Sequence, residues 1–138
     1  MNSAEAPSMK QQGTSKTTEA GAHEETVRID IHEMVRRLLN HLGPTSVALL
    51  AGAKDRKIAH GWARADGPTP RDEAQQRLQM ATRIWVLISA AEGEHVARAW
   101  FIGSNPRLGE RSPLIALREG SLVEAKDAAM AFVDGTDE

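Results

Sequence analysis

The sequence predicts an all-α protein, and three observations lead to that prediction. Hydrophobic residues make up 41% of the 138 residues but aromatic residues only 4%, so a core must be built largely from Leu, Ile, Val and Ala. Such a composition favours packed helices over a β-sandwich. From Val27 onward, apolar residues recur at steps of three and four, and no segment alternates in the manner of a strand.

The first 25 residues have a different composition from the rest. They are rich in Ser, Thr, Ala, Gly, Gln and Glu, and two Met are their only sizeable apolar residues. Such a segment cannot bury enough apolar surface to offset the loss of backbone entropy. We therefore expect residues 1–25 to form a disordered tail.

The next segment, residues 30–66, predicts three short helices in succession. The first carries an amphipathic stripe of Ile31, Met34, Val35, Leu38, Leu39 and Leu42. Asp30 is its expected N-cap, with Glu33 completing a capping box, and Gly43-Pro44 ends it. The second helix begins at Pro44 or Thr45 and closes at Gly52. The third has Asp55 as N-cap, with Ile58 and Trp62 on its buried side.

The remaining helices follow from the same signals. A breaker at residues 65–70 precedes a long helix over about 71–92, and Gly93 separates it from a helix at Glu94–Ile102. A loop dense in turn residues follows at 103–112. Pro113 then opens a short helix that Gly120 ends. The apolar residues Leu122, Val123, Ala129, Met130 and Val133 lie in a final helix with Lys126, and a polar acidic tail follows it at 134–138.

The three helices within 30–66 have the order and spacing of a helix-turn-helix, whose third helix presents its N-terminal half to the DNA major groove. The basic residues expected on one exposed face of that helix are Lys54, Arg56, Lys57, His60 and Arg64. Lysine and arginine can neutralise phosphates, and arginine can form paired hydrogen bonds with guanine. The competing interpretation is a three-helix bundle whose exposed face happens to be basic.

The distribution of charge is consistent with an anionic partner for this segment. The whole chain has a formal net charge of −2. Residues 26–80 hold nine Lys/Arg against six Asp/Glu, whereas residues 81–138 hold six against nine. The basic part of the chain thus coincides with the three-helix segment.

A second motif lies at residues 99–120, AWFIGSNPRLGERSPLIALREG. It combines Trp100 at a helix end, an Asn-Pro-Arg-Leu-Gly loop at 105–109, Pro113-Leu114 opening the next helix, and Leu117 followed by Glu119-Gly120. Together with the final helix, this pattern resembles the toxin-binding domain of Xre/MbcA/ParS-type antitoxins. The upstream helices also resemble that family's Xre-like helix-turn-helix, so the resemblance covers roughly residues 35–133.

The resemblance implies a protein partner, an RES-type toxin that consumes NAD, and repression of a shared operon through operator DNA. Two prolines and two glycines favour a rigid loop, which would hold its outward residues in a fixed arrangement. The residues expected to contact the partner are Asn105, Arg107, Glu110 and Arg111 in the loop, and Asp134, Asp137 and Glu138 in the acidic end. Trp100 is expected to be buried.

Other chemistry finds little support in the sequence. The five His residues are scattered without the spacing of metal ligands, there is no cysteine, and no Ser has a His or Asp companion at readable spacing. We expect no cofactor, no metal and no catalysis. The apolar stretches are far shorter than a bilayer span, so we expect no membrane contact and a cytoplasmic location.

These observations divide the chain into a tail (1–25), a helix-turn-helix domain with a long connecting helix (26–92) and a toxin-binding domain (93–138). An alternative is a stand-alone transcriptional regulator or adaptor of the same fold with no toxin. A palindromic operator would require a homodimer. The helix at 71–92 has enough apolar surface for a dimer contact, but also enough simply to join the two halves.

Overall fold

The computed structural model describes residues 30–136, and this part of the chain is entirely helical. It contains seven α-helices, one 3-10 turn and no strand. Their bounds are α2 Ile31–Leu42, α3 Pro44–Ala51, α4 Arg56–Ala63, α5 Asp72–Glu92, α6 Glu94–Ile102, η1 Pro106–Leu108, α7 Pro113–Arg118 and α8 Leu122–Asp134. The all-α prediction is confirmed for these residues, whereas the expected tail at 1–25 lies outside them.

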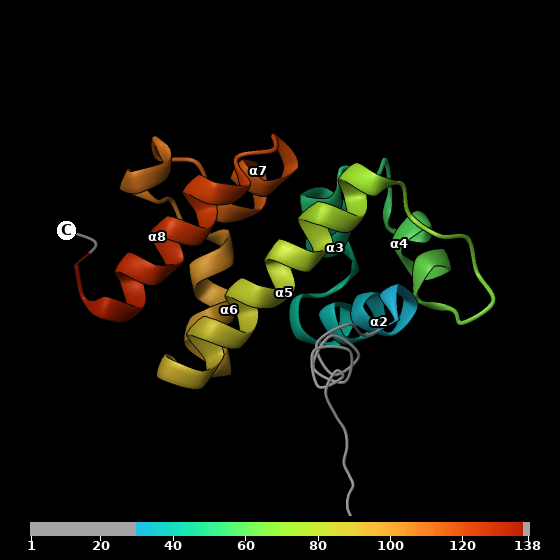
Figure 1. The fold of residues 1–138 in the computed structure, drawn as a ribbon, viewed down its shortest axis with the longest axis horizontal. Helices are drawn as coiled ribbons and strands as arrows, with labels where there is room; N and C mark the ends of the chain where they lie inside the picture. Colours follow the sequence, from blue (N-terminus) through green and yellow to red (C-terminus); the bar gives the residue numbers. More distant parts are fainter. Residues whose placement is uncertain (1–29, 137–138) are drawn as a thin grey trace, which may run out of the picture. The chain divides into compact units, whose positions relative to one another are not determined.

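The long helix α5 runs through the whole helical unit (Figure 1). It packs against α2 and α3, which in turn pack against α4. It also packs against α6 and α8, and α7 bridges back to α3. From Ile31 onward the described chain therefore forms one compact unit, in which α2–α4 lie at one end and α6–α8 at the other (Figure 1). Within residues 30–136, no helix has both the length and the apolar character needed to cross a membrane.

Trp85 joins three of the helices. Its side chain, from α5, is only 5% exposed. The ring of His41 in α2 stacks on it with centroids 4.4 Å apart, and the guanidinium carbon of Arg98 in α6 lies 5.8 Å from the ring centroid. Stacking and cation–π contacts thus add to the burial of Trp85 in holding α2, α5 and α6 together.

The sharp boundaries between α2, α3 and α4 arise where the sequence predicts them. Gly43 separates α2 from α3 with a φ of +88°, which side-chain-bearing residues rarely adopt, and Pro44 occupies the first position of α3. The Asp55 side chain caps α4 by accepting a hydrogen bond from the Ile58 backbone N–H at 3.2 Å. This confirms Asp55 as the N-cap.

The expected burial of Ile58 is wrong. Its side chain is 36% exposed, whereas Trp62 is 8% exposed and Ala59 is fully buried. Ile58 lies at the edge of an open cavity of about 680 Å³ between α4 and the start of α5, which Trp62 and Arg71 also line. The helix turns only twice, and its neighbours cover Ala59 and Trp62 but do not reach Ile58.

The buried face of α8 is built from alanine. Ala125, Ala128, Ala129 and Ala131 are its buried residues, whereas Val123 is 60% exposed and Met130 is 47% exposed. Small side chains let two helix axes approach closely, and α8 packs extensively on α5. Val123 and Met130 consequently remain at the surface, whereas Leu122, Phe132 and Val133 are half-buried.

Candidate functional site

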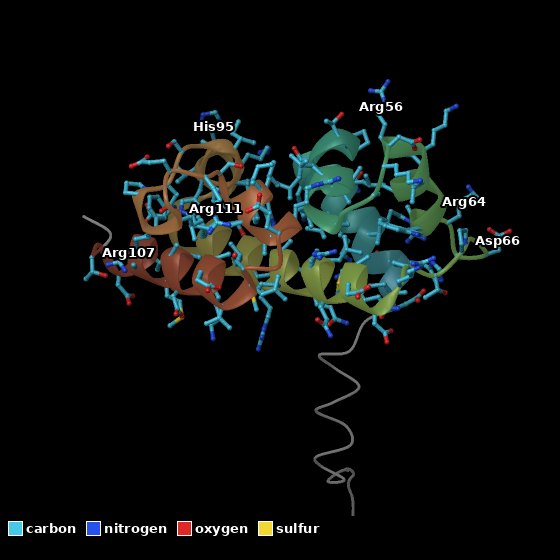
Figure 2. All side chains as sticks on the ribbon, turned by 90° about the horizontal axis from the view of Figure 1, so that it is seen from above. Arg56, Arg64, Asp66, His95, Arg107 and Arg111 are labelled. Carbon is cyan, nitrogen blue, oxygen red and sulfur yellow. The ribbon has the colours of Figure 1, made fainter. Side chains whose placement is uncertain are left out.

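The exposed face of α4 carries the predicted basic residues. Arg56, Lys57, His60 and Arg64 are all exposed, as is Lys54 in the turn before the helix. At 3.6 residues per turn, Arg56, Lys57 and His60 fall within roughly 100° around the helix axis. Figure 2 shows Arg56 and Arg64 projecting from the two ends of α4. The helix therefore presents one continuous cationic side to solvent.

Arg64 lies just beyond α4 rather than on it. The helix ends at Ala63, and Arg64 has an extended backbone with φ −78° and ψ 138°. Its Nε is 3.8 Å from Oδ1 of Asp66, and both side chains are largely exposed. Such a pair contributes little to stability, so Arg64 remains available to another anion.

Two side chains of α2 fix the C-terminal end of α4. The Nδ1 atom of His32 is 2.8 Å from the carbonyl oxygen of Trp62, and Nη2 of Arg36 donates to the Ala63 carbonyl at 3.1 Å. The last carbonyls of a helix have no partner within it, so these bonds satisfy groups that would otherwise need water. With Asp55 at its other end, α4 is held at both termini.

The turn between α3 and α4 is held by a side chain from the C-terminal half of the chain. Nη1 of Arg118, in α7, donates to the carbonyl of Leu49 at 3.0 Å and to that of Ala53 at 3.5 Å. Sequence reasoning did not single out Arg118 because its acceptors are backbone carbonyls 65 and 69 residues away. It lines an open cavity of about 510 Å³ with Lys54 and Arg56.

Asn105, a predicted partner contact, is largely buried in the loop, with 9% of the residue exposed. Its Oδ1 accepts a hydrogen bond from the Arg107 backbone N–H at 3.0 Å and so caps η1. Its backbone carbonyl also accepts from the N–H groups of Leu108 and Glu110. Asn105 thus organises the loop from within.

Arg107 and Arg111, also predicted partner contacts, both form hydrogen bonds within the fold. Arg111 donates from Nε to the Leu108 carbonyl at 2.8 Å, and from Nη1 to Glu119 at 2.8 Å and to Ser121 at 3.3 Å. The guanidinium group of Arg107 is exposed, but its Nη2 donates to the carbonyl of Thr136 at 2.7 Å. These contacts tie the loop to the turn between α7 and α8 and to the residues after α8.

Glu110 is exposed in the loop, as the sequence predicts. It has a φ of +69°, the only positive φ of a non-glycine residue within 30–136. Its Oε1 accepts a hydrogen bond from the Ser104 hydroxyl at 2.8 Å, and its backbone carbonyl accepts from the same hydroxyl at 3.0 Å. Glu110 therefore stands at the tip of the loop with its carboxylate at the surface.

The acidic end divides between two parts of the chain. Asp134 is the last residue of α8 rather than part of a tail, and Gly135 caps that helix with a φ of +75°. The helix therefore extends one residue into the segment 134–138, which the sequence predicts to be a polar tail. Asp137 and Glu138 lie outside the described residues.

Trp100 is buried as predicted, with 8% of its side chain exposed. Its ring meets Phe101 edge to face at 5.4 Å. The indole Nε1–H has no hydrogen-bond partner among the described residues. Trp100 also lines an open cavity of about 310 Å³ between α6, the loop and Phe132 of α8.

Sequence reasoning missed a group of exposed apolar side chains in the C-terminal half. Val123 and Met130 are seven residues apart, and therefore lie on the same side of α8 two turns from one another. Ile102, at the end of α6, is 65% exposed. Exposed apolar residues often mark sites of protein contact when they gather on one surface. Their signal in the sequence was ambiguous, because Val and Met at helical spacing usually indicate a core.

Residues 30–136 contain no group of three or more His, Asp or Glu side chains arranged to hold a metal ion. Comparisons with protein-family models, curated proteins and solved structures find no match to this chain.

Proposed function

We propose that this protein binds double-stranded DNA through α4 and an RES-type toxin through its C-terminal helices, acting as an antitoxin that represses its own operon. In this proposal the protein binds its partners and catalyses no reaction. The observation that carries the DNA-binding part is the cationic side of α4, on which Arg56, Lys57 and His60 have no carboxylate partner among the described residues.

The arrangement around α4 supports this part of the proposal. A reading helix must be held firmly from behind so that its exposed side chains meet the bases in one orientation. The Asp55 cap and the bonds from His32 and Arg36 hold both ends of α4. The buried Trp62 anchors its inner side. Positively charged groups on the outer side attract the phosphate backbone, whatever the base sequence.

The partner-binding part is supported by the rigid loop and the exposed apolar residues. The Asn105 cap and the contacts of Arg111 fix the motif that resembles the antitoxin domain. Val123 and Met130 give α8 an apolar strip that faces solvent. A preorganised loop beside an apolar strip is suited to protein recognition, because little conformational freedom is lost on binding.

The DNA-binding part is tested with a labelled duplex from upstream of the protein's own gene, by fluorescence anisotropy at several salt concentrations. A variant with Arg56→Ala, Lys57→Ala and Arg64→Ala should lose specific binding and show a flatter salt dependence. A control with Arg83→Glu and Lys126→Ala lowers the net charge by the same three units on α5 and α8, at positions that make no ion pair within residues 30–136. This control should bind with nearly the affinity of the unaltered protein.

Equal losses in both variants would indicate that net charge alone drives binding, and would contradict the role of α4. Undiminished affinity in the α4 variant would contradict it as well. The partner-binding part is tested separately, by measuring NAD consumption by a purified RES-type toxin with increasing amounts of the protein. Inhibition by the α4 variant should equal that of the unaltered protein, because the altered residues lie at the other end of the unit (Figure 1).

A further inference from the structure

We infer that the cavity between α3, α4 and α7 is a binding site for a backbone phosphate of DNA, and that Arg118 of the C-terminal half completes it. This inference rests on the DNA-binding function proposed above and extends it to a residue of α7. The cavity has a volume of about 510 Å³ and is open to solvent. Its lining includes Thr45 of α3, Lys54 and Arg56 at the start of α4, and Arg118.

The charge of the cavity is strongly positive. Lys54, Arg56 and Arg118 converge on it from two separate parts of the chain, and Asp55 is its only carboxylate. None of these three cations forms an ion pair with a carboxylate of residues 30–136. By contrast, Arg36, Arg37 and Arg98 each have a glutamate partner on their own helix. Three cations beside a single carboxylate leave the cavity with a net positive charge, and an anion between them would relieve their mutual repulsion.

The hydrogen-bonding groups suit a phosphate. A guanidinium group has five N–H donors, and the protein bonds of Arg118 use only those of Nη1. The donors of Nε and Nη2 remain, and two adjacent guanidinium donors can bind two phosphate oxygens together. The Thr45 hydroxyl and the Lys54 ammonium add further donors to the cavity lining. Asp55 is already occupied as the cap of α4.

The position of the cavity suits the DNA backbone rather than a base. Arg56 belongs both to the exposed side of α4 and to the cavity lining, so the two surfaces are continuous. The major groove is about 12 Å wide, and a helix inserted into it has a phosphate strand on either side. A strand that passes the N-terminal end of α4 would meet Lys54 and Arg118. Phosphate contacts of this kind fix the register of the protein on the duplex.

The test compares Arg118→Gln with Arg118→Lys in the anisotropy assay described above. Glutamine keeps an amide that can donate to the Leu49 carbonyl but has no charge, whereas lysine keeps the charge without the paired donors. Loss of one phosphate contact lowers the slope of log affinity against log salt by about 0.9. Between 50 and 200 mM salt, the affinity of Arg118→Gln should therefore fall about 3.5-fold less than that of the unaltered protein. Arg118→Lys should retain the slope.

A second variant, Lys54→Gln, keeps the inference testable if Arg118→Gln unfolds. Lys54 is exposed and makes no hydrogen bond or ion pair in the described part of the chain, so its loss should leave the fold intact while lowering the slope by a similar amount.

An unchanged slope in a folded Arg118→Gln variant, in an assay where the α4 variant loses binding, would overturn this inference alone. If Arg118→Gln instead weakened only toxin inhibition, the cavity would be a protein contact and the inference would be wrong. If the unaltered protein bound no duplex, both the inference and the DNA-binding proposal would fail.

Discussion

Arg107 and Thr136 are linked by a hydrogen bond that ties the loop after α6 to the C-terminal end of α8. Nη2 of Arg107 donates to the Thr136 carbonyl oxygen at 2.7 Å. Thr136 lies two residues beyond Asp134, the last residue of α8, and a cation near the C-terminus of a helix is favourable. The same arginine was expected from the sequence to face a partner. Its contact with Thr136 gives it a structural role in addition to any role at an interface.

Replacement of Arg107 by alanine should therefore lower the free energy of unfolding by about 0.5–1.5 kcal/mol, the usual contribution of one hydrogen bond. Urea denaturation followed by circular dichroism measures this change. Arg107→Lys should recover part of the loss, because it restores a cation near the end of α8. Arg83→Ala is the matched control, since Arg83 is exposed on α5 and makes no hydrogen bond or ion pair within residues 30–136. A loss no larger than that of the control would contradict the structural role.

The glycines near the end of α4 provide a second prediction. A Cβ atom added at Gly61 would lie 3.8 Å from the ring of Pro68, an ordinary van der Waals distance. Because glycine inside a helix costs about 1 kcal/mol relative to alanine, Gly61→Ala should stabilise the protein by about 0.5–1 kcal/mol. A Cβ atom at Gly67 would lie 2.0 Å from the Gly61 carbonyl oxygen. Gly67→Ala should accordingly destabilise the protein by about 1–3 kcal/mol.

Thermal melting of the two glycine variants measures both effects under one condition. Opposite shifts of the melting temperature are expected. A decrease for Gly61→Ala would show that α4 and the turn around Pro68 pack more closely than the distances indicate. DNA affinity of Gly61→Ala should change little, because position 61 is buried and the added Cβ would meet Pro68 and Arg64 only at ordinary van der Waals distances of 3.8 and 3.9 Å.

The order and bounds of the helices could be predicted because their signals are local. Gly43-Pro44 and Gly93 interrupt the helical pattern within a few residues, and Asp55 caps the helix that immediately follows it. The wrong expectation at Ile58 has a different origin. Whether an apolar side chain at the edge of a helix is covered depends on neighbours distant in sequence, and these reach Trp62 but leave Ile58 beside a cavity.

The hydrogen-bond partners of three arginines in the C-terminal half could not be predicted for a related reason. Arg107, Arg111 and Arg118 all donate to backbone carbonyl oxygens. Every residue has such a carbonyl, so the sequence contains no signal for which one an arginine will meet. Patterns of side chains therefore predicted the rigidity of the loop, but not the bonds that produce it.

A third prediction concerns the apolar strip of α8. Val123→Ser with Met130→Ser should change the free energy of unfolding little, because 60% and 47% of these side chains are already exposed. If the strip contacts a toxin, the double variant should inhibit it at least tenfold less effectively, as measured by NAD consumption. Lys126→Ser with Asp127→Ser is a control on the same helix that removes one positive and one negative charge and leaves the apolar strip in place. Full inhibition by the Val123 and Met130 variant would exclude the strip from the interface.

The acidic end provides the last prediction, and the structure determines where the chain should be shortened to test it. Ending the chain after Val133 removes Gly135, whose backbone N–H bonds to the carbonyls of Ala131 and Phe132. It also removes Thr136, which bonds to Ala131 through its own N–H at 2.8 Å and accepts from Arg107. This truncation should cost about 1–2 kcal/mol of stability. Its effect on a toxin would therefore combine a weakened helix end with the loss of charge.

Ending the chain after Thr136 avoids this difficulty, because it removes only Asp137 and Glu138 and keeps every bond at the end of α8. The free energy of unfolding should change by no more than a few tenths of a kcal/mol. If the two carboxylates compete with the phosphates of NAD for donors in the toxin's pocket, this protein should inhibit NAD consumption less effectively than the full chain. Asp137→Asn with Glu138→Gln should weaken inhibition to a similar extent, since it removes the charges and keeps the length. Undiminished inhibition by both proteins would leave the loop and the exposed side of α8 as the inhibitory surface.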